Sequence, residues 1–275
     1  MRFKIHRQYE ARKDAANNAV MGLLAGAQLS AHFLQPTLGS ERMLPEIFPN
    51  VEHIKRFNLR SESAAEILSA ADAHLGMMSV PYVLSLHEDY LRTCAKMLHK
   101  AGRCSATKAK ANLNELHQNI ADASGAAYTI DMIAYIDALR WMRNDVIHNG
   151  GIVRQQLIDA VRGWTQPLTD GWVALARRDP TALSVGDRIE FGHGEMVAVL
   201  AVTKRLDRET NVMLQAALPR TTWVSMVVDE ADELVPGGCG KDPILGLRKA
   251  KGVARHHYAS VGLTEAEIKA EIALR

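Results

Sequence analysis

Apolar residues recur at helical spacing along most of the chain. In the clearest window, 82–100, seven apolar positions fall near one side with charged residues opposite: Val83, Leu86, Tyr90, Leu91, Cys94, Met97 and Leu98. Spacings of three and four residues place side chains on one face of an α-helix. We therefore predict an amphipathic helix here, with Pro81 as a break before it and Gly102 as its end.

The same criterion predicts helices in most other parts of the chain. They span about 8–33, 63–78, 107–123, 127–148, 153–164, 170–177, 195–218, 222–234 and 264–274. Ser63 and Glu66 have the spacing of a capping box. Segment 184–194 is a glycine-punctuated connection with at most a short strand, and 241–257 is basic with little apolar periodicity, which is typical of a linker. The pattern predicts an all-α fold, a helical bundle with short irregular connections.

The chain is long enough for one large domain with additions, because 275 residues can bury a substantial core. No internal repeat of fixed period is visible. We expect an N-terminal helical extension (1–60), a helical bundle (61–218), and a C-terminal part (219–275) with a helix, a basic linker and a short terminal helix.

Composition excludes some classes of protein. The net charge of +2 gives no strong argument for a polyanionic partner. The three cysteines, Cys94, Cys104 and Cys239, are odd in number and lack Cys-x-x-Cys spacing, so we expect no disulfide framework, no metal site and no cofactor. No apolar run approaches the roughly 18 residues of a membrane-spanning helix. These features predict a soluble, cytoplasmic protein.

The segment 143–151, Arg-Asn-Asp-Val-Ile-His-Asn-Gly-Gly, has the strongest chemical character in the chain. Arg143 can hold a phosphate through two parallel N–H bonds, and His148 can transfer a proton near neutral pH. Asn144 lies four residues before His148 and therefore shares its helix face. The trailing glycines allow a left-handed helix end. Together these residues predict a site for phosphodiester chemistry.

Arg143 also continues an apolar stripe on its helix, so its guanidinium is expected to face an interior or an interface. A buried guanidinium needs a carboxylate, carbonyl groups or an anionic ligand. We identify Glu88 and Asp89, on the helix over 82–100, as candidate supporting carboxylates that would orient Arg143.

The spacing alone leaves a structural alternative open. Arg143 could be a buried ion-pair partner, and His148 could cap the end of its helix. The same five-residue spacing recurs at Arg188 and His193, in a stretch with no predicted helix and no polar residue after the arginine. We regard that second instance as incidental.

The motif Arg143-Asn144-x-x-x-His148, with the preceding helix containing Leu-His-Glu-Asp-Tyr-Leu at 86–91, resembles the HEPN superfamily of helical ribonuclease domains. The resemblance covers about 80–218. It implies a HEPN-like bundle whose catalytic residues are Arg143, Asn144 and His148, and a homodimer in which two motifs line one cleft. It also implies a metal-independent endoribonuclease of toxin–antitoxin or antiviral-defence type, with an antitoxin or another defence protein as partner.

Two further possibilities remain open. The basic residues of segment 241–257 could contact RNA or could simply be solvated: Lys241, Arg248, Lys249, Lys251 and Arg255. As an alternative to catalysis, the chain could be a catalytically silent HEPN-like binding or adaptor module that acts through protein or nucleotide partners. RNA left intact by the purified protein would favour that alternative.

Overall fold

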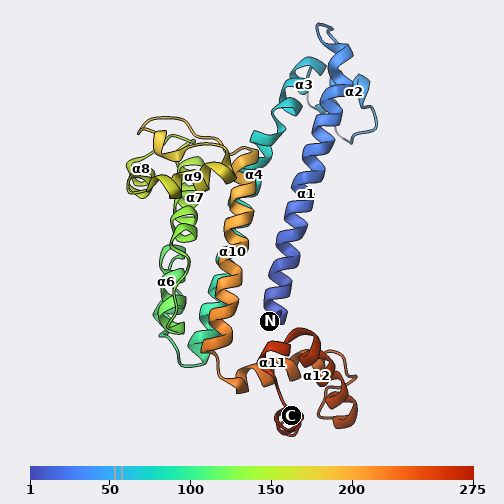
Figure 1. The fold of residues 1–275 in the computed structure, drawn as a ribbon. Helices are drawn as coiled ribbons and strands as arrows, with labels where there is room; N and C mark the ends of the chain where they lie inside the picture. The colour runs from blue at the N-terminus through green and yellow to red at the C-terminus, as the bar shows by residue number, and fades with distance from the viewer. Residues whose placement is uncertain (53, 57) are drawn as a thin grey trace. The chain divides into compact units, whose positions relative to one another are not determined.

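The computed structural model describes residues 1–275 except 53 and 57, and the described chain is helical as expected (Figure 1). Its α-helices are α1 (Lys4–Leu34), α2 (Leu44–Ile47), α3 (Ser61–Ser69), α4 (Ala71–Lys100), α5 (Ala106–Ala109), α6 (Leu113–Ser124), α7 (Ile130–His148), α8 (Gln155–Arg162), α9 (Gln166–Ala176), α10 (His193–Ala217), α11 (Arg220–Asp232), α12 (Pro243–His257) and α13 (Glu265–Ile272). Short 3-10 helices are η1 (Gln35–Thr37), η2 (Ile54–Arg56), η3 (Pro180–Ala182) and η4 (Ala259–Val261). Within the described residues, β pairing is limited to two isolated bridges, Met43 with Arg60 and Ile152 with Arg188.

The chain forms two compact units, each built from segments that are distant in sequence. Unit 1 contains Met1–Arg12, Ser85–Ile133 and Val202–Arg275, and unit 2 contains Lys13–Leu84 and Ala134–Ala201. The boundaries between the two units fall inside α1, α4, α7 and α10. The three consecutive segments expected from the sequence, 1–60, 61–218 and 219–275, stay a prediction.

Unit 2 contains the segment with the Arg143 motif. Its aromatic centre is formed by Tyr135 of α7 with Trp164 and Trp172, whose ring centroids lie 5.4–5.7 Å from one another. The Tyr135 hydroxyl donates a hydrogen bond to the Leu168 carbonyl at 2.7 Å. A second cluster, near the C-terminal end of α1, joins Leu34 to α3 (Figure 1). The motif helix is thus anchored by a buried aromatic group before it reaches the motif.

Unit 1 has a core rich in aromatic and polar side chains. Tyr9 and Tyr90 stack with centroids 4.5 Å apart, and the Nε2 atoms of His87 and His117 lie 3.0 Å apart. Burial raises the pKa of Cys94 to about 12, so this thiol stays protonated. At the other end of the unit, α11, α12 and α13 pack on one another (Figure 1).

Several predicted boundaries are wrong. Pro81 does not break the chain's path but lies inside α4, where its neighbours Val80, Val83 and Leu84 are buried. The packing of this face offsets the loss of the helical hydrogen bond that proline, which has no backbone N–H, cannot donate. The window 63–78 divides into α3 and the start of α4, and α3 begins at Ser61 without a side-chain cap, so Ser63 and Glu66 form no capping box.

The predicted linker over 241–257 is the helix α12. Pro243 occupies its first turn, and the Asp242 carboxylate caps it by accepting the Leu245 N–H at 2.9 Å. Its buried positions are Gly246, Ala250, Val253 and Ala254. Because this face is made of small residues, it lacks the large hydrophobic side chains that usually reveal an amphipathic helix.

No single helix of the described chain has the length and apolar character needed to cross a membrane. Only α3 and α4 taken together, bent by 53° at their junction, meet those two criteria.

Candidate functional site

The end of α7 has the left-handed cap that its glycines predict. Gly150 and Gly151 have φ values of 61° and 83°, a backbone conformation that side chains with a Cβ rarely adopt. The amides of Asn149 and Gly151 both donate to the carbonyl of Asp145, each at 3.0 Å. Backbone amides therefore satisfy the carbonyl of Asp145 in the last turn of α7.

The segment after the cap is fixed by backbone pairing with 186–189. The Ile189 amide donates to the Gly151 carbonyl at 2.8 Å, and the Val153 amide donates to the Asp187 carbonyl at 2.9 Å. A Cβ at Gly151 would lie 2.7 Å from the Ile189 carbonyl oxygen. Gly151 is thus required both by its φ and by the close approach of the paired segment.

Asp145 is the structural carboxylate of the motif, and sequence reasoning overlooked it. Its side chain is 1% exposed, accepts a hydrogen bond from Arg154 Nε at 2.6 Å, and accepts the Arg154 amide at 3.1 Å. This pair ties the last turn of α7 to the start of α8. The signal in the sequence is weak, because an aspartate and an arginine nine residues apart do not have the spacing of three or four residues that brings side chains together on a helix.

The three predicted catalytic residues lie together on the C-terminal part of α7. Arg143 and Asn144 are half-buried, and Arg143 Nη1 donates to Asn144 Oδ1 at 3.0 Å. His148 is exposed, one helical turn beyond Asn144. Side chains four residues apart on a helix have Cβ atoms about 5–6 Å apart, so the Arg143–Asn144 pair and His148 can reach one small group.

Neither part of the structural alternative is found in the described residues. Arg143 has no ion-pair partner there, because the buried ion pair of this turn joins Asp145 to Arg154. Among the described residues His148 makes no hydrogen bond to a carbonyl of α7, and the carbonyl of Asp145 accepts the amides of Asn149 and Gly151. Arg143 and His148 therefore remain available to a ligand.

The predicted supporting carboxylates have other partners. On α4, Glu88 accepts hydrogen bonds from Nε and Nη2 of Arg92, four residues further along the helix. Asp89 pairs with Arg12 at 3.3 Å. Both ion pairs lie within unit 1, so the expectation that Glu88 and Asp89 orient Arg143 has no support in these contacts.

The second arginine–histidine pair lies next to the motif but differs in geometry. Arg188 is in the segment that pairs with 151–153, is 69% exposed, and lies 3.5 Å from Glu190. His193 is the first residue of α10. The two side chains do not share a helix, which agrees with the interpretation that this spacing is incidental.

The basic residues predicted to contact RNA separate into groups. Arg248, Lys251 and Arg255 lie along one face of α12 and line a pocket of about 530 Å³. Lys249 lies about 100° around the helix from Arg248, and Lys241 precedes the helix. Within the described chain, no group of three or more histidine, cysteine or acidic side chains is placed to hold a metal ion.

The catalytic candidates differ in exposure: His148 is exposed, and Arg143 and Asn144 are half-buried. Five pockets of about 350–610 Å³ in the described chain are lined by other residues.

Comparison of the chain with protein-family models, with curated proteins and with solved structures gave no match.

Proposed function

We propose that this protein is a metal-independent endoribonuclease of toxin or antiviral-defence type, with Arg143, Asn144 and His148 as its active residues. The resemblance to the HEPN superfamily suggests the reaction. The observation that supports it most is that Arg143 and His148 have no ion-pair partner among the described residues, whereas Asp145 and Arg154 in the same region are paired with each other.

In the proposed reaction, the RNA 2′-hydroxyl attacks the adjacent phosphorus. The bond from O2′ to phosphorus forms and the bond from phosphorus to O5′ breaks. O2′ gives up its proton, and the leaving O5′ takes up a proton to become a hydroxyl. The products are a 2′,3′-cyclic phosphate and a 5′-hydroxyl. DNA lacks the attacking group and would not be cleaved.

Each active residue has one role in this scheme. His148 transfers a proton, and Arg143 stabilises the negative charge that develops on the phosphorane-like transition state. Asn144 holds the Arg143 guanidinium through Oδ1, which leaves its amide N–H groups to donate to a phosphate oxygen.

A homodimer would complete the site. One histidine can serve only one of the two proton transfers at a time, and a second copy would bring a second His148 into the cleft. An antitoxin or another defence protein is the expected regulatory partner.

The proposal is tested by incubating the purified protein and its His148→Ala variant with total RNA and transfer RNA in EDTA, then identifying the fragment ends. Cleavage by the unmodified protein alone, leaving cyclic phosphate, would support it. RNA that is bound but left intact by both proteins would instead favour the catalytically silent binding module.

A further inference from the structure

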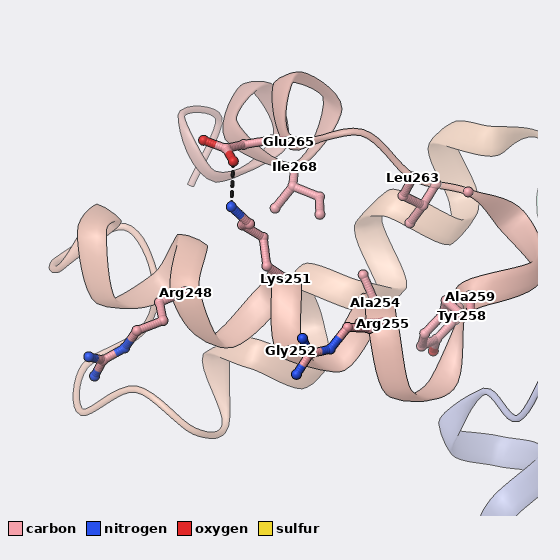
Figure 2. A pocket seen from close by; sticks show the side chains of 11 residues that line it. Arg248, Lys251, Gly252, Ala254, Arg255, Tyr258, Ala259, Leu263, Glu265 and Ile268 are labelled. Atoms are coloured by element: carbon pink, nitrogen blue, oxygen red, sulfur yellow. Dashed lines mark hydrogen bonds and ion pairs between the residues drawn. The ribbon is translucent and has the colours of Figure 1, made fainter.

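A second candidate site lies in unit 1, in the pocket between α12 and the segment 258–268. The pocket has a volume of about 530 Å³, within the range usual for small-molecule sites. Figure 2 shows Arg248 and Arg255 on either side of Lys251 along α12, with Leu263 and Ile268 contributed by the opposing segment. The pocket thus combines a basic helix face with an apolar wall.

The positive charge of this pocket is only partly neutralised. Its lining has three cationic side chains and one carboxylate, Glu265, which pairs with Lys251 (Figure 2). Lys269 also contacts Glu265, at 3.1 Å, and the two lysines lower the pKa of that carboxyl. Arg248 and Arg255 have no ion-pair partner among the described residues, and both are exposed.

Two other arginines of unit 1, Arg220 at the start of α11 and Arg275 after the end of α13, have several partners each. Arg220 makes two hydrogen bonds to Glu267 and two to the carbonyls of Val261 and Gly262. Arg275 bonds to Asp229, Asp232 and Glu271. Arg220 and Arg275 therefore each bind several acceptors, whereas among the described residues Arg248 and Arg255 line the pocket without an ion-pair partner.

We infer that this pocket binds a phosphorylated nucleoside, either as a free nucleotide or as the 5′-terminal nucleotide of an RNA strand. The planar guanidinium groups of Arg248 and Arg255 suit bidentate contact with phosphate oxygens. The apolar side of the pocket, where Leu263 is half-buried and Ile268 is buried, suits the face of a base. Inorganic phosphate has no apolar group that could contact this side of the pocket.

Binding at this pocket is independent of cleavage at His148, so the two proposals fail separately. The test uses the full-length protein, titrated by calorimetry with AMP, with inorganic phosphate, and with a trinucleotide carrying either a 5′-phosphate or a 5′-hydroxyl. We expect saturable binding of AMP or of the phosphorylated trinucleotide. A preference for AMP identifies a free nucleotide as the ligand, and a preference for the phosphorylated trinucleotide identifies an RNA end.

Substitutions distinguish specific binding in the pocket from non-specific attraction of a phosphate to positive charge. Arg248→Gln and Arg255→Gln should each weaken binding by about ten- to a hundredfold, as expected when a hydrogen bond to a charged group is lost. Lys249→Gln removes the same charge from a different face of α12 and should change affinity less than twofold. Leu263→Ala should weaken the nucleotide more than inorganic phosphate. Thermal unfolding confirms that each variant is folded.

Three outcomes would overturn this assignment. One is the absence of saturable binding for every phosphorylated probe. Another is an equal loss of affinity in Lys249→Gln and Arg255→Gln. The third is binding of inorganic phosphate as tight as that of AMP and of the phosphorylated trinucleotide. Unchanged nucleotide affinity in His148→Ala would show that this pocket is separate from the proposed cleavage site.

Discussion

At the residue scale, the end of α7 separates charged side chains that stabilise structure from those that remain available. Asp145 and Arg154 are bound to each other, and the Asp145 carboxylate is buried. Arg143 bonds only to a neutral amide among the described residues, and His148 is exposed. The sequence predicts Arg143 and His148 from their chemistry. It does not predict the pairing of Asp145 with Arg154, because that pairing depends on a turn that brings residues nine positions apart into contact.

Asp145→Ala should lower the free energy of unfolding by about 1.5–3 kcal/mol, because hydrogen bonds to a charged group are lost while Arg154, 38% exposed, can be rehydrated. Urea denaturation measures this change. Asp159→Ala is the matched control: its ion pair with Arg162 is exposed, so its loss should cost less than about 1 kcal/mol. Equal effects in the two variants would contradict the structural role of Asp145.

Glu267 gives a pH dependence of stability. Hydrogen bonds from Arg220 and from Thr264 lower its pKa from 4.5 to about 2 in the folded protein. A depressed carboxyl pKa contributes stability that is present above about pH 4.5 and is lost as the pH falls toward 2. Glu267→Gln should therefore flatten the decline in melting temperature over this range. A decline as steep as that of the unmodified protein would contradict the assignment.

At the scale of elements, prediction from sequence worked where large apolar side chains form the buried face. The helices α7 and α10 and the terminal helix α13 follow that rule and end close to their predicted residues. The rule failed for α12, whose buried face is small residues, and at Pro81, where buried neighbours carry α4 through a residue that usually ends a helix. In both cases the helix depends on contacts with distant segments of the chain. These contacts cannot be recognised from the hydrophobic pattern of one sequence.

Two glycines of α12 test its packing. A Cβ at Gly246 would lie 2.7 Å from Cys239 Cβ, whereas a Cβ at Gly252 would meet nothing within 4 Å. Gly246→Ala should therefore destabilise the protein by about 1–3 kcal/mol through overpacking. Gly252→Ala should stabilise it by about 0.5–1 kcal/mol, because alanine favours a helix. The same sign for both changes in urea denaturation would show that α12 does not pack in this way.

At the scale of the whole molecule, the Arg143 motif and the α12 pocket lie in different units of the chain. The catalytic candidates could be identified from the sequence because arginine, asparagine and histidine are residue types that can bind phosphate or transfer a proton. The pocket could not, since its apolar wall comes from 263–268 and its basic residues resemble an ordinary solvated surface. Only folding joins these two segments.

The proposed homodimer makes cleavage depend on protein concentration. If two copies complete one site, the rate per chain should rise with concentration and level off where sedimentation velocity shows the dimer to be fully formed. A constant rate per chain through the range in which a monomer predominates would contradict the two-copy site.

The most direct test of the central claim is the rate of RNA cleavage in EDTA by the unmodified protein, by His148→Ala and by His193→Ala. Both histidines are exposed and lie at helix ends in unit 2, but only His148 shares a helix face with Asn144. We predict that His148→Ala lowers the rate by about 10²–10⁴, as for loss of a proton-transfer group, and that His193→Ala leaves it unchanged. Equal rates for all three proteins, or no cleavage by the unmodified protein, would contradict the proposed active site.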